Sequence, residues 1–161
     1  MALDPAFLAD CPYLPSGLFV DEVLEVDRSG LGRVSVRVPT FEDLPLTGAQ
    51  RAHPERHPRH VAGGLLVHLT GIAGFVHAYY VMDLRHADGW IGYGVRIHSA
   101  RFSALARIGP PLVLTATATQ IRRGTSRILA RYRFVFQQES ASVYEGDQTA
   151  LFSRLEPSRD A

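Results

Sequence analysis

The sequence predicts a single α+β domain in which an antiparallel sheet wraps around one long, buried helix. Three observations support this expectation. The stretch from Val61 to Met82 holds no Asp, Glu, Lys or Arg over 22 residues, as expected for a helix that is covered on all sides. Segments before and after it alternate apolar and polar residues, which is typical of half-buried strands. The length of 161 residues suits one domain, 1–161, with one core.

The composition narrows the classes of function. Hydrophobic residues make up 46% of the chain and charged residues 20%, with a formal net charge of +1. This charge gives no sign of a nucleic-acid partner, which would need many phosphate contacts. Cys11 is the single cysteine, so a reducing, cytoplasmic location is expected. The segment Met1–Asp10 lacks a basic region and is not expected to be a secretory signal.

Two strands and a loop are expected before the helix. Leu18–Asp27 reads as a strand with acidic residues between apolar ones, and Gly30 and Gly32 form a turn. Arg33–Val38 then alternates strictly between valine and polar residues, which predicts a hairpin with one wet face. The stretch Pro39–His60 has four prolines and no periodicity. Loops of this length in compact domains are usually functional.

The uncharged stretch itself carries a helical apolar stripe. Its members are Leu65, Leu69, Ile72, Val76 and Tyr79 or Tyr80. We expect Gly71 and Gly74 to let a strand backbone approach the helix closely. The stretch is long enough to span a membrane, but its histidines, tyrosines and glycines favour a helix covered by a sheet, so no membrane partner is expected.

Four more strands are expected after the turn at Asp88-Gly89, namely Trp90–His98, Leu112–Arg122, Ser126–Gln137 and Ser142–Ser153. The short turn Arg122–Thr125 makes two of them antiparallel neighbours. In Ser126–Gln137 one face carries Ile128, Ala130, Tyr132, Phe134 and Phe136. The core spans about residues 14–153, and the polar tail Glu156–Ala161 is expected to fray.

This order of elements is the hot-dog arrangement, in which a curved antiparallel sheet surrounds a central helix. A sheet that covers one helix leaves an open edge. Such edges commonly pair with each other, so we expect a homodimer or a higher even oligomer.

Short motifs add a resemblance to a family. They are CPYLPSGLFVDEVLEVD at Cys11–Asp27, ARF at Ala100–Phe102 followed by GPPLVL at Gly109–Leu114, RRG at Arg122–Gly124, and VYEGD at Val143–Asp147. In this order and spacing they resemble the hot-dog 3-hydroxyacyl-thioester dehydratases over about Leu14 to Phe152. The resemblance implies an enzyme that removes water from a 3-hydroxyacyl group carried by acyl carrier protein or CoA, in fatty-acid or polyketide-type metabolism.

The catalytic motif of that family agrees in part. The family has a loop histidine, a glycine turn, and a helix that bears a carboxylate. With Gly63 on the motif glycine, His68 occupies the position of the carboxylate, and His53 lies one residue away from the motif histidine. The resemblance places His68 in the site, while His57 and His60 are the loop histidines nearest the expected helix start, so these three are the catalytic candidates. The amides of Gly63 and Gly64, at the expected helix start, would stabilise the thioester oxygen.

Each candidate has a plainer alternative. The loop histidines could be ordinary exposed residues, or His53, His57 and His60 could bind zinc, although no acid or cysteine completes a recognised pattern. His68 could be a core histidine that bonds to a backbone carbonyl. We expect no metal and no other cofactor.

Arg122 and Arg123 are candidates for contact with the phosphate or the acidic carrier of the thioester, while the other arginines of the strands suit a solvated face. Two further functions stay open. A thioesterase on the same scaffold would hydrolyse the acyl thioester. A non-catalytic acyl-binding or scaffold subunit is the other, because His68 cannot act as the family's carboxylate does.

Overall fold

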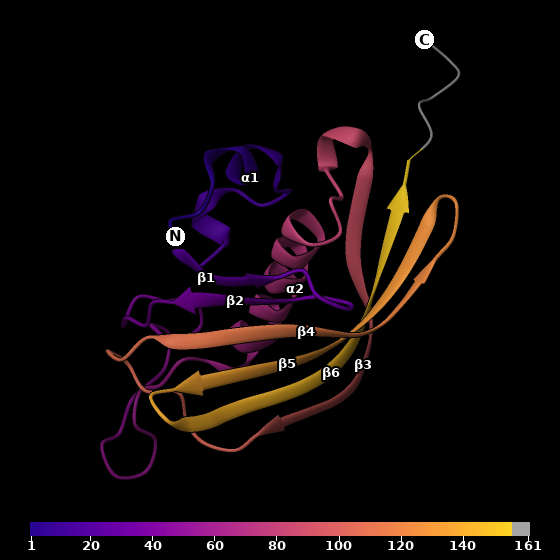
Figure 1. Cartoon of the computed structure of the whole chain (residues 1–161). Helices are drawn as coiled ribbons and strands as arrows, with labels where there is room; N and C mark the ends of the chain where they lie inside the picture. Colours follow the sequence, from indigo (N-terminus) through magenta and orange to yellow (C-terminus); the bar gives the residue numbers. More distant parts are fainter. Residues whose placement is uncertain (156–161) are drawn as a thin grey trace.

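The computed structural model describes residues 1–155, and the predicted tail Glu156–Ala161 lies outside this range. Figure 1 shows a curved sheet with the long helix α2 (Gly63–Tyr80) on its inner side. The strands are β1 (Glu22–Asp27), β2 (Arg33–Val38), β3 (Trp90–Phe102), β4 (Leu112–Arg123), β5 (Arg127–Gln138) and β6 (Ala141–Arg154). Three short helical segments are α1 (Pro5–Asp10), η1 (Pro15–Gly17) and η2 (His86–Asp88).

All neighbouring strands pair antiparallel, in the order β1-β2-β4-β5-β6-β3. The predicted neighbours around the Arg122–Thr125 turn are β4 and β5, which confirms that pairing. The predicted sheet around one buried helix is also confirmed. Among residues 1–155, no helix is long and apolar enough to cross a membrane.

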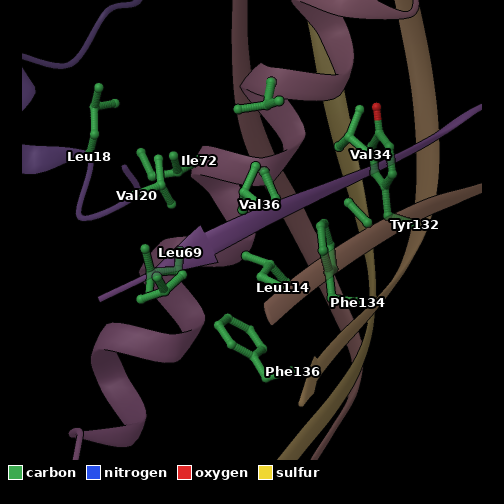
Figure 2. Close-up of a cluster of buried hydrophobic side chains, with 14 of the residues drawn as sticks. Leu18, Val20, Val34, Val36, Leu69, Ile72, Leu114, Tyr132, Phe134 and Phe136 are labelled. Atoms are coloured by element: carbon green, nitrogen blue, oxygen red, sulfur yellow. The ribbon is translucent and has the colours of Figure 1, made fainter. Parts of the chain in front are cut away.

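The core lies between the inner face of the sheet and α2. Figure 2 shows aliphatic and aromatic side chains from β2, β4 and β5 meeting Leu69 and Ile72 of the helix. The predicted face of β5 is buried along its whole length, as its alternating exposure shows. The apolar and polar residues of β5 therefore alternate because one face of the strand packs against the helix while the arginines of the other face contact solvent.

Besides the strand predicted as Trp90–His98, which runs on to Phe102 as β3, two predicted features differ from the structure. The first strand begins at Glu22 rather than Leu18, because Phe19 has φ 51° and takes the chain out of extended geometry. Leu18 and Val20 are buried nonetheless, so their apolar character reflects a loop packed on the core. The second difference concerns Gly71 and Gly74, which a strand does not approach closely: a Cβ added at either would meet nothing within 4 Å.

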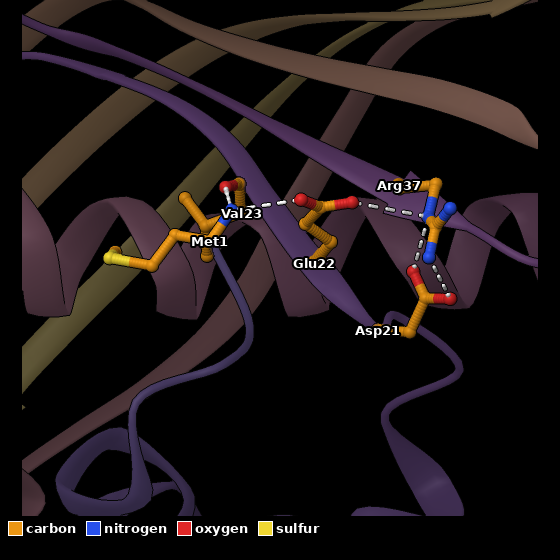
Figure 3. A network of polar contacts seen from close by, with 5 residues as sticks. All are labelled: Met1, Asp21, Glu22, Val23 and Arg37. Carbon is orange, nitrogen blue, oxygen red and sulfur yellow. Dashed lines mark hydrogen bonds and ion pairs between the residues drawn. The ribbon is translucent and has the colours of Figure 1, made fainter.

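The two edges of the sheet differ. Along β1, Ala2 forms a bridge with Glu22, and the Met1 ammonium donates to Glu22 Oε1 at 2.9 Å and to the Val23 carbonyl at 3.0 Å. Figure 3 shows this contact continuing to Arg37, which pairs with Glu22 and with both oxygens of Asp21. The Met1 ammonium lowers the pKa of Glu22. At the other edge, no segment of residues 1–155 pairs with the outer side of β3.

Candidate functional site

The start of α2 is held by a residue distant in sequence. Ala62 is the N-cap and has no capping side chain, but its amide donates to the hydroxyl of buried Thr47 at 3.1 Å. The helix begins at Gly63, as predicted. Within residues 1–155 the amides of Gly63 and Gly64 have no hydrogen-bond partner. Such amides at a helix start can bind an anionic oxygen.

Both glycines make room for a neighbouring side chain. A Cβ on Gly63 would lie 3.0 Å from a ring carbon of Phe102, and a Cβ on Gly64 would lie 3.3 Å from Leu46. Phe102 and Leu46 are themselves more than half exposed. The first turn of α2 is therefore flanked by two surface side chains that a ligand could displace.

His60 is held through both its ring and its backbone. Its Nδ1 lies 2.8 Å from the carbonyl of Pro58, so Nδ1 carries the proton and Nε2 has a free lone pair. Its backbone is held at both ends by the Gln50 side chain, which accepts from the His60 amide and donates to the His60 carbonyl. A histidine fixed in this tautomer can accept a proton at Nε2.

The other two loop histidines have different surroundings. His53 Nδ1 accepts from the amides of Glu55 and Arg56, at 3.3 and 3.2 Å, so this ring closes a turn. The His57 ring packs edge-on against the His60 ring, with 5.1 Å between their centroids. No group of three or more His, Cys, Asp or Glu among residues 1–155 is arranged to hold a metal ion.

His68 lies away from these residues. Its Nε2 donates to the carbonyl of Gly17 at 2.9 Å, and its ring packs against Tyr13 and Phe19. The side chain thereby joins α2 to the segment that follows α1. These contacts are those of a histidine bonded to a backbone carbonyl in a packed environment.

A cavity of about 180 Å³ lies between α2 and the edge of the sheet. We call it the slot. Four glycines border it, namely Gly71, Gly74, Gly92 and Gly94, together with aromatic rings from α2, β3, β5 and β6. A Cβ at Gly71, Gly74 or Gly94 would meet nothing within 4 Å, so the missing side chains create the space. Its lining in the described chain contains no Asp, Glu, Lys, Arg or His.

One wall of the slot is polar. Thr70 Oγ1 lies 2.7 Å from the Val67 carbonyl and 3.0 Å from Gln148 Oε1, and Gln148 Nε2 donates to the Tyr144 hydroxyl at 3.2 Å. Burial raises the pKa of Tyr144, so its hydroxyl stays neutral. This wall can offer hydrogen bonds to a ligand but no charge.

A larger, shallow depression of about 700 Å³ lies on the outer face of the sheet. Its charged residues largely neutralise one another, since Arg131 pairs with Asp147 and Arg133 with Glu145. Arg131 also lowers the pKa of Asp147. An apolar ligand is better accommodated by the slot, because the slot is lined by apolar rings.

Arg122 and Arg123 do not meet the other candidates. They lie at the end of β4, next to the hairpin that leads into β5. Figure 1 shows this hairpin and the 39–60 loop at opposite ends of the sheet. One end of α2 is therefore close to His57, His60, Gly63 and Gly64. The other end is close to the two arginines.

Sequence reasoning missed the slot. Two signals were present, since Gly92 and Gly94 interrupt a run of large side chains from Trp90 to His98. Glycine within a strand often marks a place where another group approaches. Gln148 could not have been singled out, because its role depends on Thr70, 78 residues away.

This combination of a curved antiparallel sheet, a central helix and an apolar slot beside it is the hot-dog fold, and solved structures agree. A thioesterase of Haemophilus influenzae is 16% identical, with a TM-score of 0.56 over 89% of this chain and 85% of that one. A protein of Lactococcus lactis described as a candidate thioesterase is 11% identical, with a TM-score of 0.60 over 86% and 95%.

A third similar structure is a sigma28-regulated virulence protein of Campylobacter jejuni, 13% identical, with a TM-score of 0.59 over 91% of this chain and 83% of that one. No family model matches the chain, and no curated protein matches it in sequence. At these identities the similarity defines the fold. The predicted hot-dog fold is confirmed, whereas the resemblance to dehydratases in particular has no support from these neighbours.

Proposed function

We propose that the protein binds an acyl thioester, with the acyl chain in the slot, and hydrolyses it. The observation that carries the proposal is the uncharged, glycine-bordered slot beside a helix whose first amides are free. Gly63 and Gly71 are eight residues apart, or about 12 Å along the helix axis. An acyl chain lying along α2 could therefore reach the slot while its carbonyl stays near the helix start.

In this mechanism each group has one task. The amides of Gly63 and Gly64 donate to the thioester oxygen as it gains negative charge. His60 Nε2, freed by the bond of Nδ1 to Pro58, takes a proton from the attacking water. The water oxygen bonds to the thioester carbon, the C–S bond breaks as the tetrahedral intermediate collapses, and His60 returns its proton to the leaving thiolate. His57, packed against His60, would position the ring.

Hydrolysis has better support than the predicted dehydration. Removal of water from a 3-hydroxyacyl group needs a base and an acid beside carbons two and three of the acyl chain. His60 could serve as the base at the helix start, but His68, which the resemblance puts in the position of the acid, has its Nε2 bonded to the Gly17 carbonyl. Two of the similar structures are also described as thioesterases, one of them as a candidate.

A second candidate is binding without turnover. Position 68 carries a histidine bonded to Gly17 in place of the carboxylate of the dehydratase motif, and this favours binding alone, because an active site usually holds a titratable group close to the reacting atoms. In that case the protein would retain the acyl thioester and leave it intact.

One experiment separates these functions. The parent protein and His60→Gln are each incubated with a panel of acyl-CoA and 3-hydroxyacyl-CoA substrates. The release of free thiol and the absorbance of the enoyl product are measured in the same reactions. We expect thiol release, and a loss of about 100-fold or more in kcat for His60→Gln with acyl binding retained. His53→Asn is the matched control, because asparagine can still accept from the two turn amides.

Other outcomes would change the assignment. Enoyl formation without thiol release would establish a dehydratase. Saturable binding with neither product would establish the non-catalytic protein. Equal loss in His60→Gln and His53→Asn would remove His60 from the chemistry and leave it a role in loop structure.

A further inference from the structure

A second, smaller cavity adjoins the slot. It has a volume of about 80 Å³ and lies beneath α1, where Cys11, Ala78 and Leu84 are among its lining residues. We call it the α1 cavity. Three residues line both spaces, namely Phe75, Gly92 and Phe152. The two cavities are therefore neighbours with a common wall.

This wall contains two aromatic rings that both lie close to a glycine. A Cβ added to Gly92 would lie 2.7 Å from two ring carbons of Phe152 and 3.2 Å from a ring carbon of Phe75. A side chain at position 92 would push these rings away, so glycine in β3 allows α2 and β6 to bring them together. Phe152 is 3% exposed, while Phe75 is partly exposed.

The size of the slot limits what fits in front of this wall. An apolar cavity of about 150 Å³ can hold a benzene molecule, so a slot of about 180 Å³ takes a group of similar size. A longer chain would run into the rings of Phe75 and Phe152. Beyond them lies the α1 cavity, whose lining is mostly apolar but also includes Asp10 and His86.

We propose that Phe75 and Phe152 set the upper limit of acyl-chain length, and that the α1 cavity is an unused extension of the slot. The proposal rests on the proposed function, since it assigns the slot to an acyl chain. Acyl chains just long enough to reach the slot from the helix start would fill it and stop at the wall. Longer chains would bind only if the Phe75 ring moved aside.

The test is to remove the half-buried ring. Phe75→Ala joins the two cavities, so chains that extend into the α1 cavity should bind better. Burying one methylene stabilises by about 0.8 kcal/mol, or about fourfold in affinity, so two added methylenes should gain about tenfold or more. S-alkyl-CoA thioethers of short, medium and long chain, which cannot be hydrolysed, are titrated by calorimetry against both proteins.

A second variant controls for a nonspecific loss of packing in Phe75→Ala. Cys11→Phe fills the α1 cavity from its far side, and alone it should leave the binding of every chain length unchanged. Combined with Phe75→Ala, it should cancel the gain for long chains. Phe75→Leu, which retains more of the packing, serves if the alanine variant does not fold.

The outcomes distinguish this proposal from the function on which it rests. If the parent protein binds no S-alkyl-CoA, the proposed function fails. If it binds chains that end in the slot, and Phe75→Ala and Phe75→Leu both keep its chain-length preference, the wall is not the limit. If the parent already binds long chains and Cys11→Phe weakens them, the cavities are not separated in solution and the proposal is wrong.

Discussion

His77 is a fully buried histidine in the last turn of α2. Its Nε2 donates to the Leu31 carbonyl at 3.1 Å, and its Nδ1 accepts from the Tyr132 hydroxyl at 3.0 Å. Burial lowers the pKa of His77 and raises the pKa of Tyr132. Both groups are therefore neutral in the folded protein at pH 7.

This environment predicts acid sensitivity. The unfolded chain protonates His77 near the ordinary pKa of about 6.5, whereas the folded protein resists protonation until lower pH. The stability that His77 contributes should thus be complete above about pH 6.5, and the free energy of unfolding should fall as the pH drops below that value. Urea unfolding at several pH values measures this. His77→Gln, which keeps a donor and an acceptor, should flatten the dependence over this range, and an unchanged slope would contradict the assignment.

Gly74 offers a second test at the level of a residue. A glycine within a helix costs about 1 kcal/mol relative to alanine, and a Cβ there would meet nothing within 4 Å. Gly74→Ala should therefore stabilise the fold by about 0.5 to 1 kcal/mol while narrowing the slot. Gly74→Leu should block acyl binding. Urea unfolding and calorimetric titration check the two effects.

The neighbouring residue supplies the control for this pair. Ala73 is fully buried and does not line the slot. Ala73→Gly should destabilise by a similar amount and leave acyl affinity as it was. Destabilisation by Gly74→Ala would mean that the space beside Gly74 is not free.

At the level of elements, Thr47 connects the 39–60 loop to the start of α2. Its buried hydroxyl accepts from the Ala62 amide at 3.1 Å. Thr47→Val keeps the shape and removes the acceptor, so we expect a loss of about 1 to 3 kcal/mol in unfolding free energy. Because the Gly63 and Gly64 amides follow directly, thiol release should also fall.

A second threonine distinguishes positioning from stability. Thr40 is buried too, and its hydroxyl accepts from the Gly109 amide and donates to the Pro110 carbonyl. Thr40→Val should lower stability comparably without affecting the helix start. If both variants reduce thiol release equally when fully folded, Thr47 has no particular role in placing α2.

Elements were more predictable than the site. The strictly alternating β5 and the uncharged α2 are specified by periodicity, which depends on local sequence alone. The bend at Phe19 could not be predicted, because the neighbouring Leu18 and Val20 look like strand residues in the sequence. They are apolar because they are buried in a loop that packs on the core. The slot, and the contacts of Gln50 and Thr47, arise between segments far apart in the chain. A single sequence carries no periodic signal for such contacts.

For the whole molecule, the unequal edges of the sheet predict a dimer. The edge of β1 is covered by Met1 and Ala2, while Tyr93–Phe102 of β3 are exposed throughout. Ile97 is 52% exposed on this edge. Long, exposed apolar edges are usually covered by a partner. We expect sedimentation analysis to give a dimer that Ile97→Lys converts to a monomer.

The control for that variant lies on an inner strand. Leu129 of β5 is also exposed and apolar, but β4 and β6 flank its strand. Leu129→Lys should leave the dimer intact. A parent protein that sediments as a monomer at every concentration would rule out pairing through β3.

Gly92, Tyr93 and Gly94 belong both to the wall of the slot and to the uncovered edge. If pairing with a second copy orders this stretch of backbone, dimerisation through β3 and ligand binding in the slot depend on the same residues. The two equilibria are then thermodynamically coupled. Diluting the protein into monomers should then lower its affinity for the ligand. Saturating the protein with ligand should raise the dimerisation constant by the corresponding factor.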